Sequence, residues 1–200
     1  IVVSIVVPVF NEEWAIVPLW KKLAEIIDAN RAYTWRIVFV NDGSTDKTSD
    51  KLAYIETLDS SITIIELREN YGTAQAMQAG FDLVESEYVV CISANLENDP
   101  QDIPLLVEKL ERGFDVCVGW RCSPLTGKLS RPGPRRLINW CISKLAGLEI
   151  HDYECALRAY RTKSVRPLRL SGNLDRYIPV FVHWRGGRVT EQKIKQLPLS

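Results

Sequence analysis

Apolar segments alternate with amphipathic segments over residues 1–119 of the chain. Residues 1–9 are rich in Val and Ile, as expected for a strand that is buried on both faces of a parallel sheet. The next segment places Ile16, Leu19 and Leu23 on one stripe, with Pro18 close to its start, which is the pattern of an amphipathic helix. Both patterns recur, so this half of the chain is expected to alternate between strand and helix.

This alternation indicates the fold class. Strands are expected at residues 1–9, 35–40, 62–67, 88–92 and 114–119, and helices after residue 15 and at residues 46–58, 73–84 and 102–112. Strands that are joined by helices favour an α/β fold with a mainly parallel central sheet flanked by helices.

The second part of the chain is less regular. Residues 120–134 are rich in Gly, Pro, Ser and Arg and are expected to form a loop, followed by helices at 135–146 and 174–184 and a strand at 187–195. A long Arg-rich connection favours an active-site flap over a second domain, so residues 1–200 are expected to be one domain. Because the chain begins with Ile1 in a strand and its single methionine is Met77, we expect it to be a piece of a longer protein.

Composition excludes some classes of function. Lys and Arg together number 25, as do Asp and Glu, so no net charge points to nucleic acid as a partner. The five cysteines form no C-x-x-C pair, which favours a reducing, cytoplasmic compartment. The sequence has no signal peptide and no run of about eighteen apolar residues, so these residues are not expected to span a membrane.

Each expected strand ends in a polar cluster. Ligands of open α/β sheets bind at the carboxyl ends of the strands, so these clusters predict a binding cleft. Each cluster also has an ordinary structural interpretation, as a turn, a helix cap or favourable charges at a helix N-terminus. Their order and spacing together favour the cleft. The clusters are residues 8–13, 41–46, 68–72, 93–102 and 119–121.

The clusters also carry a family resemblance. Residues 3–13, 40–46 and 68–72 resemble the corresponding motifs of family 2 inverting glycosyltransferases, which have the GT-A fold. Residues 151–161 resemble the polyprenyl-phosphate branch, which contains dolichyl-phosphate mannosyltransferases and undecaprenyl-phosphate sugar transferases. The resemblance extends over nearly all of residues 1–191. It implies transfer of a sugar from a nucleotide-diphosphate donor to a polyprenyl phosphate by a single inverting displacement.

The resemblance also implies a donor site. Pro8, Phe10, Glu12 and Asp42 match the residues that hold the base and ribose of the nucleotide, and Ala94 matches a residue that packs beside the ribose. A carboxylate such as that of Asp42 accepts hydrogen bonds from base N–H groups. Neither the base nor the sugar of the donor can be assigned from these residues.

The family's metal-binding motif is altered in this chain. Members of the family hold Mg²⁺ or Mn²⁺ with an Asp-Ala-Asp-Leu-Gln segment, and the metal neutralises the diphosphate leaving group. Here the matching residues are Ser93, Ala94, Asn95, Leu96 and Glu97. Three interpretations remain open: a weakened variant, replacement of the lost acids by Glu97, or stabilisation of the leaving group by Arg and Lys without metal. We favour impaired metal binding, with Ser93, Asn95 and Glu97 as the remaining candidate ligands.

A basic, acid-free segment is the candidate acceptor site. Residues 116–148 contain no Asp or Glu, and the guanidinium group of Arg binds phosphate through paired hydrogen bonds. A solvated basic face is the alternative interpretation. The resemblance places the acceptor phosphate at Arg121 and Arg131. It places Asp152 near the reacting centre, to orient the acceptor or act as a base, so that Asp152, Asn95 and Arg121 are the candidate catalytic residues.

The predicted partners follow from this assignment. They are a nucleotide-diphosphate sugar, a polyprenyl-phosphate lipid and a membrane surface, which Trp120 and the basic loop are candidates to contact. The resemblance therefore predicts a protein at the cytoplasmic face of a membrane, truncated here before its C-terminal membrane-associated segments. Two other functions remain open. They are a non-catalytic domain that binds nucleotide sugars and a glycan synthase that acts on a hydroxyl acceptor.

Overall fold

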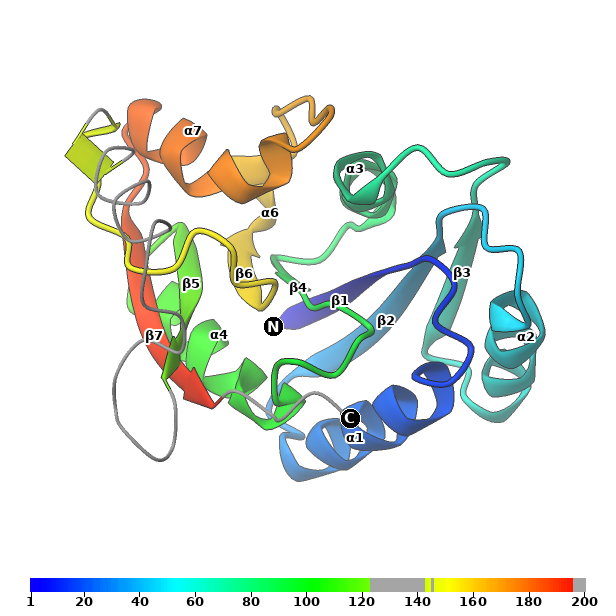
Figure 1. Ribbon diagram of the computed structural model, residues 1–200. Helices are drawn as coiled ribbons and strands as arrows, with labels where there is room; N and C mark the ends of the chain where they lie inside the picture. Colours follow the sequence, from blue (N-terminus) through cyan, green and yellow to red (C-terminus); the bar gives the residue numbers. More distant parts are fainter. Residues whose placement is uncertain (123–142, 145, 196–200) are drawn as a thin grey trace.

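A seven-stranded sheet forms the centre of the protein, with helices on both faces (Figure 1). The structure, a computed structural model, describes residues 1–122, 143–144 and 146–195. The strands are β1 (Val2–Val9), β2 (Thr34–Asn41), β3 (Ile62–Glu66), β4 (Tyr88–Cys91), β5 (Val116–Cys122), β6 (Arg158–Arg161) and β7 (Val189–Lys195). The helices are α1 (Ile16–Ala29), α2 (Thr48–Leu58), α3 (Thr73–Leu83), α4 (Ile103–Glu111), α6 (Thr162–Val165) and α7 (Ile178–Trp184), with 3₁₀ turns η1 (Pro100–Asp102) and η2 (Leu174–Tyr177).

The sheet confirms the predicted α/β class with mainly parallel strands. Its order is β3-β2-β1-β4-β6-β5-β7, and the pairs β2–β3, β1–β2, β1–β4 and β5–β7 are parallel. The sequence analysis did not predict β6, which runs antiparallel between β4 and β5. Its four residues, with an arginine at each end, are too few to show a strand pattern. Arg158 pairs with Cys91 and Val118, so this inserted strand begins at the carboxyl edge of its neighbours.

Three boundaries differ from the predicted ones. Strand β5 continues to Cys122, where a loop was expected from residue 120, because β7 pairs with it up to that residue. The helix expected over residues 174–184 is divided into η2 and α7, and Pro179 lies in the first turn of α7, where its missing N–H is not needed. The helix expected over residues 135–146 lies mainly outside the described residues.

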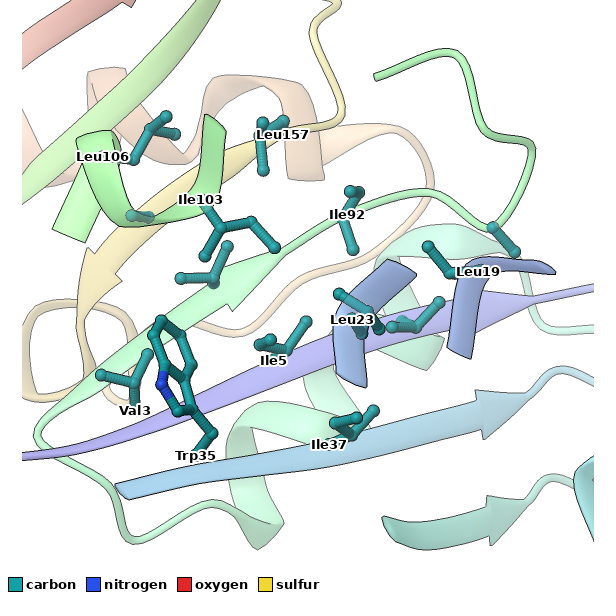
Figure 2. Close-up of a cluster of buried hydrophobic side chains, with 14 of the residues drawn as sticks. Val3, Ile5, Leu19, Leu23, Trp35, Ile37, Ile92, Ile103, Leu106 and Leu157 are labelled. Atoms are coloured by element: carbon teal, nitrogen blue, oxygen red, sulfur yellow. The ribbon is translucent and has the colours of Figure 1, made fainter. Parts of the chain in front are cut away.

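Two hydrophobic layers enclose the sheet, one on each face. Helices α1, α2 and α4 cover one face, and α3, α6 and α7 cover the other (Figure 1). Figure 2 shows the first layer, in which Ile5 of β1 and Leu23 of α1 lie close to Ile103 of α4. Burying a side chain of this size contributes roughly 1.5–3 kcal/mol. These layers hold the strand ends, and therefore the polar clusters, at one rigid edge.

Gly43, in the loop after β2, lies so close to the loop after β3 that only glycine fits. It has a φ of 67°, and a Cβ atom at this position would lie 2.5 Å from the carbonyl carbon of Glu69. Gly43→Ala is therefore expected to lower the free energy of unfolding by about 3 kcal/mol, through backbone strain and overpacking together.

Gly147→Ala is the matched control, because Gly147 has the same φ of 67° but no atom of the described residues within 4 Å of an added Cβ. It is expected to lose only the strain contribution of about 1–2 kcal/mol. Urea denaturation measures both values. Equal losses in the two variants would show that the contact with Glu69 costs nothing.

Candidate functional site

A cavity of about 470 Å³ opens at the carboxyl edge of the sheet, a size typical of small-molecule sites. The elements that form it are the ends of β1, β2, β4 and β5, the first turns of α3 and the segments around β6 and η2. Its lining residues are Pro8, Val9, Phe10, Glu12, Asp42, Thr73, Met77, Cys91, Ile92, Ser93, Glu97, Arg121, Glu154, Ala156, Arg158, Asp175 and Arg176.

The β1 and β2 side of the cavity carries four of the five predicted nucleotide-binding residues. Pro8, Phe10, Glu12 and Asp42 all line it, and Phe10 is 43% exposed. Burial, and secondarily the charge of Asp46, raises the pKa of Glu12. Their roles in binding base and ribose stay predictions, but the four side chains do meet on one side of one cavity.

Asp42 is held in place by the loop that precedes α3. Its carboxylate accepts hydrogen bonds from the backbone N–H groups of Tyr71 and Gly72, both at 2.8 Å. A carboxylate has about four acceptor positions, so two remain for a ligand. Asp42 therefore both braces the cavity wall and retains the acceptor capacity that the predicted contact with a base needs.

Asn11 links the loop after β1 to the loop after β2 by hydrogen bonds. Its Oδ1 accepts a hydrogen bond from the backbone N–H of Thr45 at 2.8 Å, and its own N–H donates to Ser44 Oγ at 2.9 Å. Asn11 has a φ of 54°, a conformation that asparagine tolerates better than most residues. The ends of β1 and β2 thus form one connected wall.

The altered motif forms a tight turn after β4. Ser93 lines the cavity, whereas the Oδ1 atom of Asn95 accepts the backbone N–H of Glu97 at 3.1 Å. Ala94, predicted to pack beside the ribose, is 1% exposed and belongs to the hydrophobic layer under α1. Leu96 completes the turn with a φ of 57°. Of the candidate metal ligands, Ser93 and Glu97 line the cavity, and the amide oxygen of Asn95 already has a partner.

Arg121 forms one cluster with Asp152 and Glu97, and the sequence suggested a separate role for each of the three. Its Nε and Nη2 donate to the two carboxylate oxygens of Asp152, at 2.7 and 2.9 Å, and its Nη1 lies 3.6 Å from Glu97 Oε2. Burial by itself lowers the pKa of Arg121, but the hydrogen bonds and charge of Asp152 outweigh it and the pKa is raised. One ion cluster thus contains Asp152, the predicted catalytic carboxylate, Arg121, the predicted phosphate ligand, and Glu97, the candidate replacement for the lost metal ligands.

Glu191 of β7 positions this cluster, and the sequence analysis missed it. Its Oε1 accepts the backbone N–H of His151 at 2.7 Å and that of Asp152 at 3.4 Å, while its Oε2 lies 2.7 Å from His151 Nδ1. The ring of Trp120, a predicted membrane contact, stacks on His151 with centroids 4.0 Å apart. A single Glu in a predicted strand gave no signal for this role, because the contact crosses about 40 residues of chain.

Two further arginines line the cavity near the start of β6. Arg158 is 4% exposed and donates to the backbone oxygens of Cys155, Asp175 and Tyr153 at 2.7, 2.7 and 2.6 Å. Within the described residues it forms no ion pair with a carboxylate. The Nε atom of Arg176 is buried without a hydrogen-bond acceptor. The sequence analysis selected neither Arg158 nor Arg176 as a site residue.

The described residues do not fit the divalent metal of the family. Mg²⁺ and Mn²⁺ need several oxygen ligands, and no group of three or more His, Cys, Asp or Glu within the described parts of the chain is placed to hold an ion. Glu97 and Asp152 already share Arg121. A dication that took both carboxylates would lie beside that guanidinium, with a repulsion on the order of several kcal/mol.

Two predictions fall wholly or partly outside what the structure describes. Arg131, the second predicted ligand of the acceptor phosphate, lies outside the described residues. No helix among residues 1–122, 143–144 and 146–195 is both long enough and apolar enough to cross a bilayer.

Curated relatives resemble this chain over nearly its whole length. The dodecaprenyl-phosphate galacturonate synthase of Rhizobium johnstonii is 35% identical over 199 residues, which are 98% of this chain and 58% of that protein. The undecaprenyl-phosphate 4-deoxy-4-formamido-L-arabinose transferase of Pseudomonas aeruginosa is 35% identical over 183 residues, or 90% of this chain and 53% of that protein. The chain thus spans a little over half the length of these relatives.

Solved structures share the fold. Glucosyl-3-phosphoglycerate synthase from Mycobacterium tuberculosis, in complex with Mn²⁺, UDP and phosphoglyceric acid, superposes with a TM-score of 0.73 at 15% identity and covers 100% of this chain and 70% of its own. A mannosyltransferase from Pyrobaculum calidifontis, in complex with GDP-Man and Mn²⁺, gives 0.70 at 18% identity, with 97% and 56% covered. The predicted GT-A fold is confirmed. Residues 4–169 match the model of Glycosyl transferase family 2, and the chain belongs to this family.

Proposed function

We propose that this chain is the catalytic domain of a glycosyltransferase that moves a sugar from a nucleoside diphosphate to a polyprenyl phosphate. The observation that carries the proposal is that Phe10 and Asp42 line the same cavity as Arg121, the partner of Asp152. One side of this cavity suits a nucleoside and the other an anionic acceptor. The names of both curated relatives, which refer to a polyprenyl phosphate, support the same assignment.

The proposed reaction is a single displacement. A phosphate oxygen of the acceptor attacks the anomeric carbon, the bond from that carbon to the diphosphate oxygen breaks, and its electron pair leaves with the nucleoside diphosphate. The acceptor is already an anion at neutral pH, so no strong general base is needed. The configuration at the anomeric carbon is inverted because attack comes from the face opposite the leaving group.

Arg121 binds the acceptor phosphate in this proposal, and Asp152 positions Arg121. A guanidinium has five N–H donors, of which Asp152 takes two and Glu97 faces a third. Two donors therefore remain for phosphate oxygens. Both oxygens of Asp152 are already hydrogen-bonded to Arg121, so Asp152 acts by holding the guanidinium in place and not by removing a proton.

The altered turn at Ser93 and Asn95 keeps a second function open. A domain that retains the nucleoside side of the cavity but does not transfer the sugar would bind donors without consuming them. We favour catalysis because Arg121 retains N–H donors that an acceptor phosphate can use. The proposed location is the cytoplasmic face of a membrane, where a polyprenyl phosphate and a soluble nucleotide sugar meet.

Transfer by the full-length protein tests the proposal. The protein is incubated with UDP-, GDP- or dTDP-sugars and undecaprenyl phosphate in detergent, and glycolipid and nucleoside diphosphate are measured together. We expect one donor class to give equal amounts of both products and undecaprenol, which lacks the phosphate, to give neither. Donor binding without transfer for every sugar would establish the binding domain, and transfer only to a glycan hydroxyl would establish a glycan synthase.

A further inference from the structure

Arg158 and Arg176 line the same cavity as the nucleoside residues, from β6 and η2. The sheet order places the ends of β2 and β1 first, then β4 with Ser93, then β6 and β5. Asp42 and Phe10 follow β2 and β1, while Arg158 begins β6 beside the carboxyl ends of β4 and β5. A donor whose base lies near Phe10 would extend its diphosphate along this edge toward the two arginines.

Among the described residues, neither of these arginines forms a direct ion pair with a carboxylate, as Arg121 does. Arg121 is shared by two carboxylates. Arg158 is buried and donates hydrogen bonds to three backbone carbonyls, with the charge of Asp175 acting on it, and Arg176 has a buried Nε with no acceptor. A buried cation without a paired anion is costly, and a buried donor without an acceptor adds to that cost. A bound anion would reduce both costs.

We propose that Arg158 and Arg176 bind the diphosphate of the donor directly, so that nucleoside diphosphates bind without a divalent cation. The inference rests on the proposed function only in taking the donor to be a nucleoside diphosphate. Guanidinium groups match phosphate oxygens in geometry and stay protonated. When the bond between the anomeric carbon and the diphosphate oxygen breaks, the electron pair remains on that oxygen beside two cations.

The acids of this region are consistent with the same arrangement. Glu154 and Asp175 also line the cavity, but Arg158 bonds to the backbone oxygen of Asp175 and not to its carboxylate. Carboxylates accept hydrogen bonds from sugar hydroxyls. The arginines therefore suit the diphosphate, and these two acids suit the sugar attached to it.

Calorimetric titration of the full-length protein tests the inference. The probes are UDP, GDP, uridine and inorganic pyrophosphate, each titrated with EDTA and with Mn²⁺. We expect the preferred nucleoside diphosphate to bind in EDTA with nearly the same Kd as in Mn²⁺, and uridine to bind at least about tenfold more weakly than UDP if UDP is preferred.

Two variants locate the effect. Arg176→Gln is expected to weaken nucleoside diphosphate binding about tenfold and to leave uridine binding unchanged. Arg169→Gln is the matched control, because Arg169 is nearby in the sequence but 77% exposed and paired with Asp82. Arg158→Lys keeps the charge but loses most of the three carbonyl bonds, and its melting temperature shows whether the fold survives.

Each outcome separates this inference from the proposed function. A Kd that weakens more than about tenfold in EDTA overturns the inference, even if transfer with Mn²⁺ is intact. An Arg176→Gln variant that binds as well as Arg169→Gln overturns it also. Binding of pyrophosphate in EDTA, without binding of any nucleoside diphosphate, would support the anion site and contradict the proposed donor.

Discussion

Replacing Arg121 with methionine is expected to abolish sugar transfer and to lower the free energy of unfolding by about 3–5 kcal/mol. Arg121 is buried and forms two short hydrogen bonds with Asp152, whose side chain is also buried. Without the guanidinium, the carboxylates of Asp152 and Glu97 lose the cation that they share at this site. Urea denaturation measures the loss of stability, and release of nucleoside diphosphate measures the loss of activity.

A double-mutant cycle separates the two losses. Arg121→Met combined with Asp152→Leu removes both charges of the pair, and the double variant is expected to regain stability relative to Arg121→Met while remaining inactive. Arg112→Gln is the surface control, because its pair with Glu108 is well exposed and is expected to contribute less than about 1 kcal/mol. If Arg121→Met retained full transfer, the proposed phosphate contact would be wrong.

Restoring the two acids, Ser93→Asp with Asn95→Asp, is expected to give a large gain in Mn²⁺-dependent transfer, about tenfold to a hundredfold. Ser93 lines the cavity, so an aspartate there adds a charged oxygen ligand at the expected place of the diphosphate. Aspartate at position 95 can still accept the backbone N–H of Glu97, as Asn95 does. A metal held there would stabilise the negative charge that develops on the leaving group.

The same double variant has a second expected property. In EDTA it should bind nucleoside diphosphate more weakly than the natural protein, because two added negative charges then face the diphosphate without a metal. Ser93→Asn with Asn95 unchanged is the control, since it adds similar volume without charge. Rates of nucleoside diphosphate release are measured across a Mn²⁺ titration. Equal activity before and after the double substitution would show that this turn never depended on the acids.

Strands β1, β2, β4 and β5 could be predicted because most of their residues are buried on both faces of the sheet. Such strands appear in the sequence as short apolar runs, and the intervening helices have apolar positions at helical spacing. The short strand β6 could not be found in this way. Only its hydrogen bonds to β4 and β5 define it, and those partners lie far away in the sequence. The extension of β5 depends on β7 for the same reason.

The sequence indicated several individual residues of the site, but it did not indicate which of them interact with one another. The motifs indicated Asp42, Arg121 and Asp152 separately, and the structure shows that the last two form one pair. Glu191 and Arg176 carried no motif. Glu191 is identified only by the hydrogen bonds that its carboxylate accepts from the backbone N–H groups of His151 and Asp152. Arg176 is identified only by its buried Nε, which has no acceptor.

The sequence by itself determined the alternation of strands and helices, the edge at which the polar clusters gather and the loss of the two metal-binding acids. Each of these is a local property, written in the residue types and spacing of a short segment. Only the tertiary structure decided which charges neutralise one another. Glu97, Arg121 and Asp152 come together from three separate segments, whereas Arg158 and Arg176 are left without carboxylate partners among the described residues. Coulomb energies and hydrogen bonds depend on distance and direction in space, which no local pattern encodes.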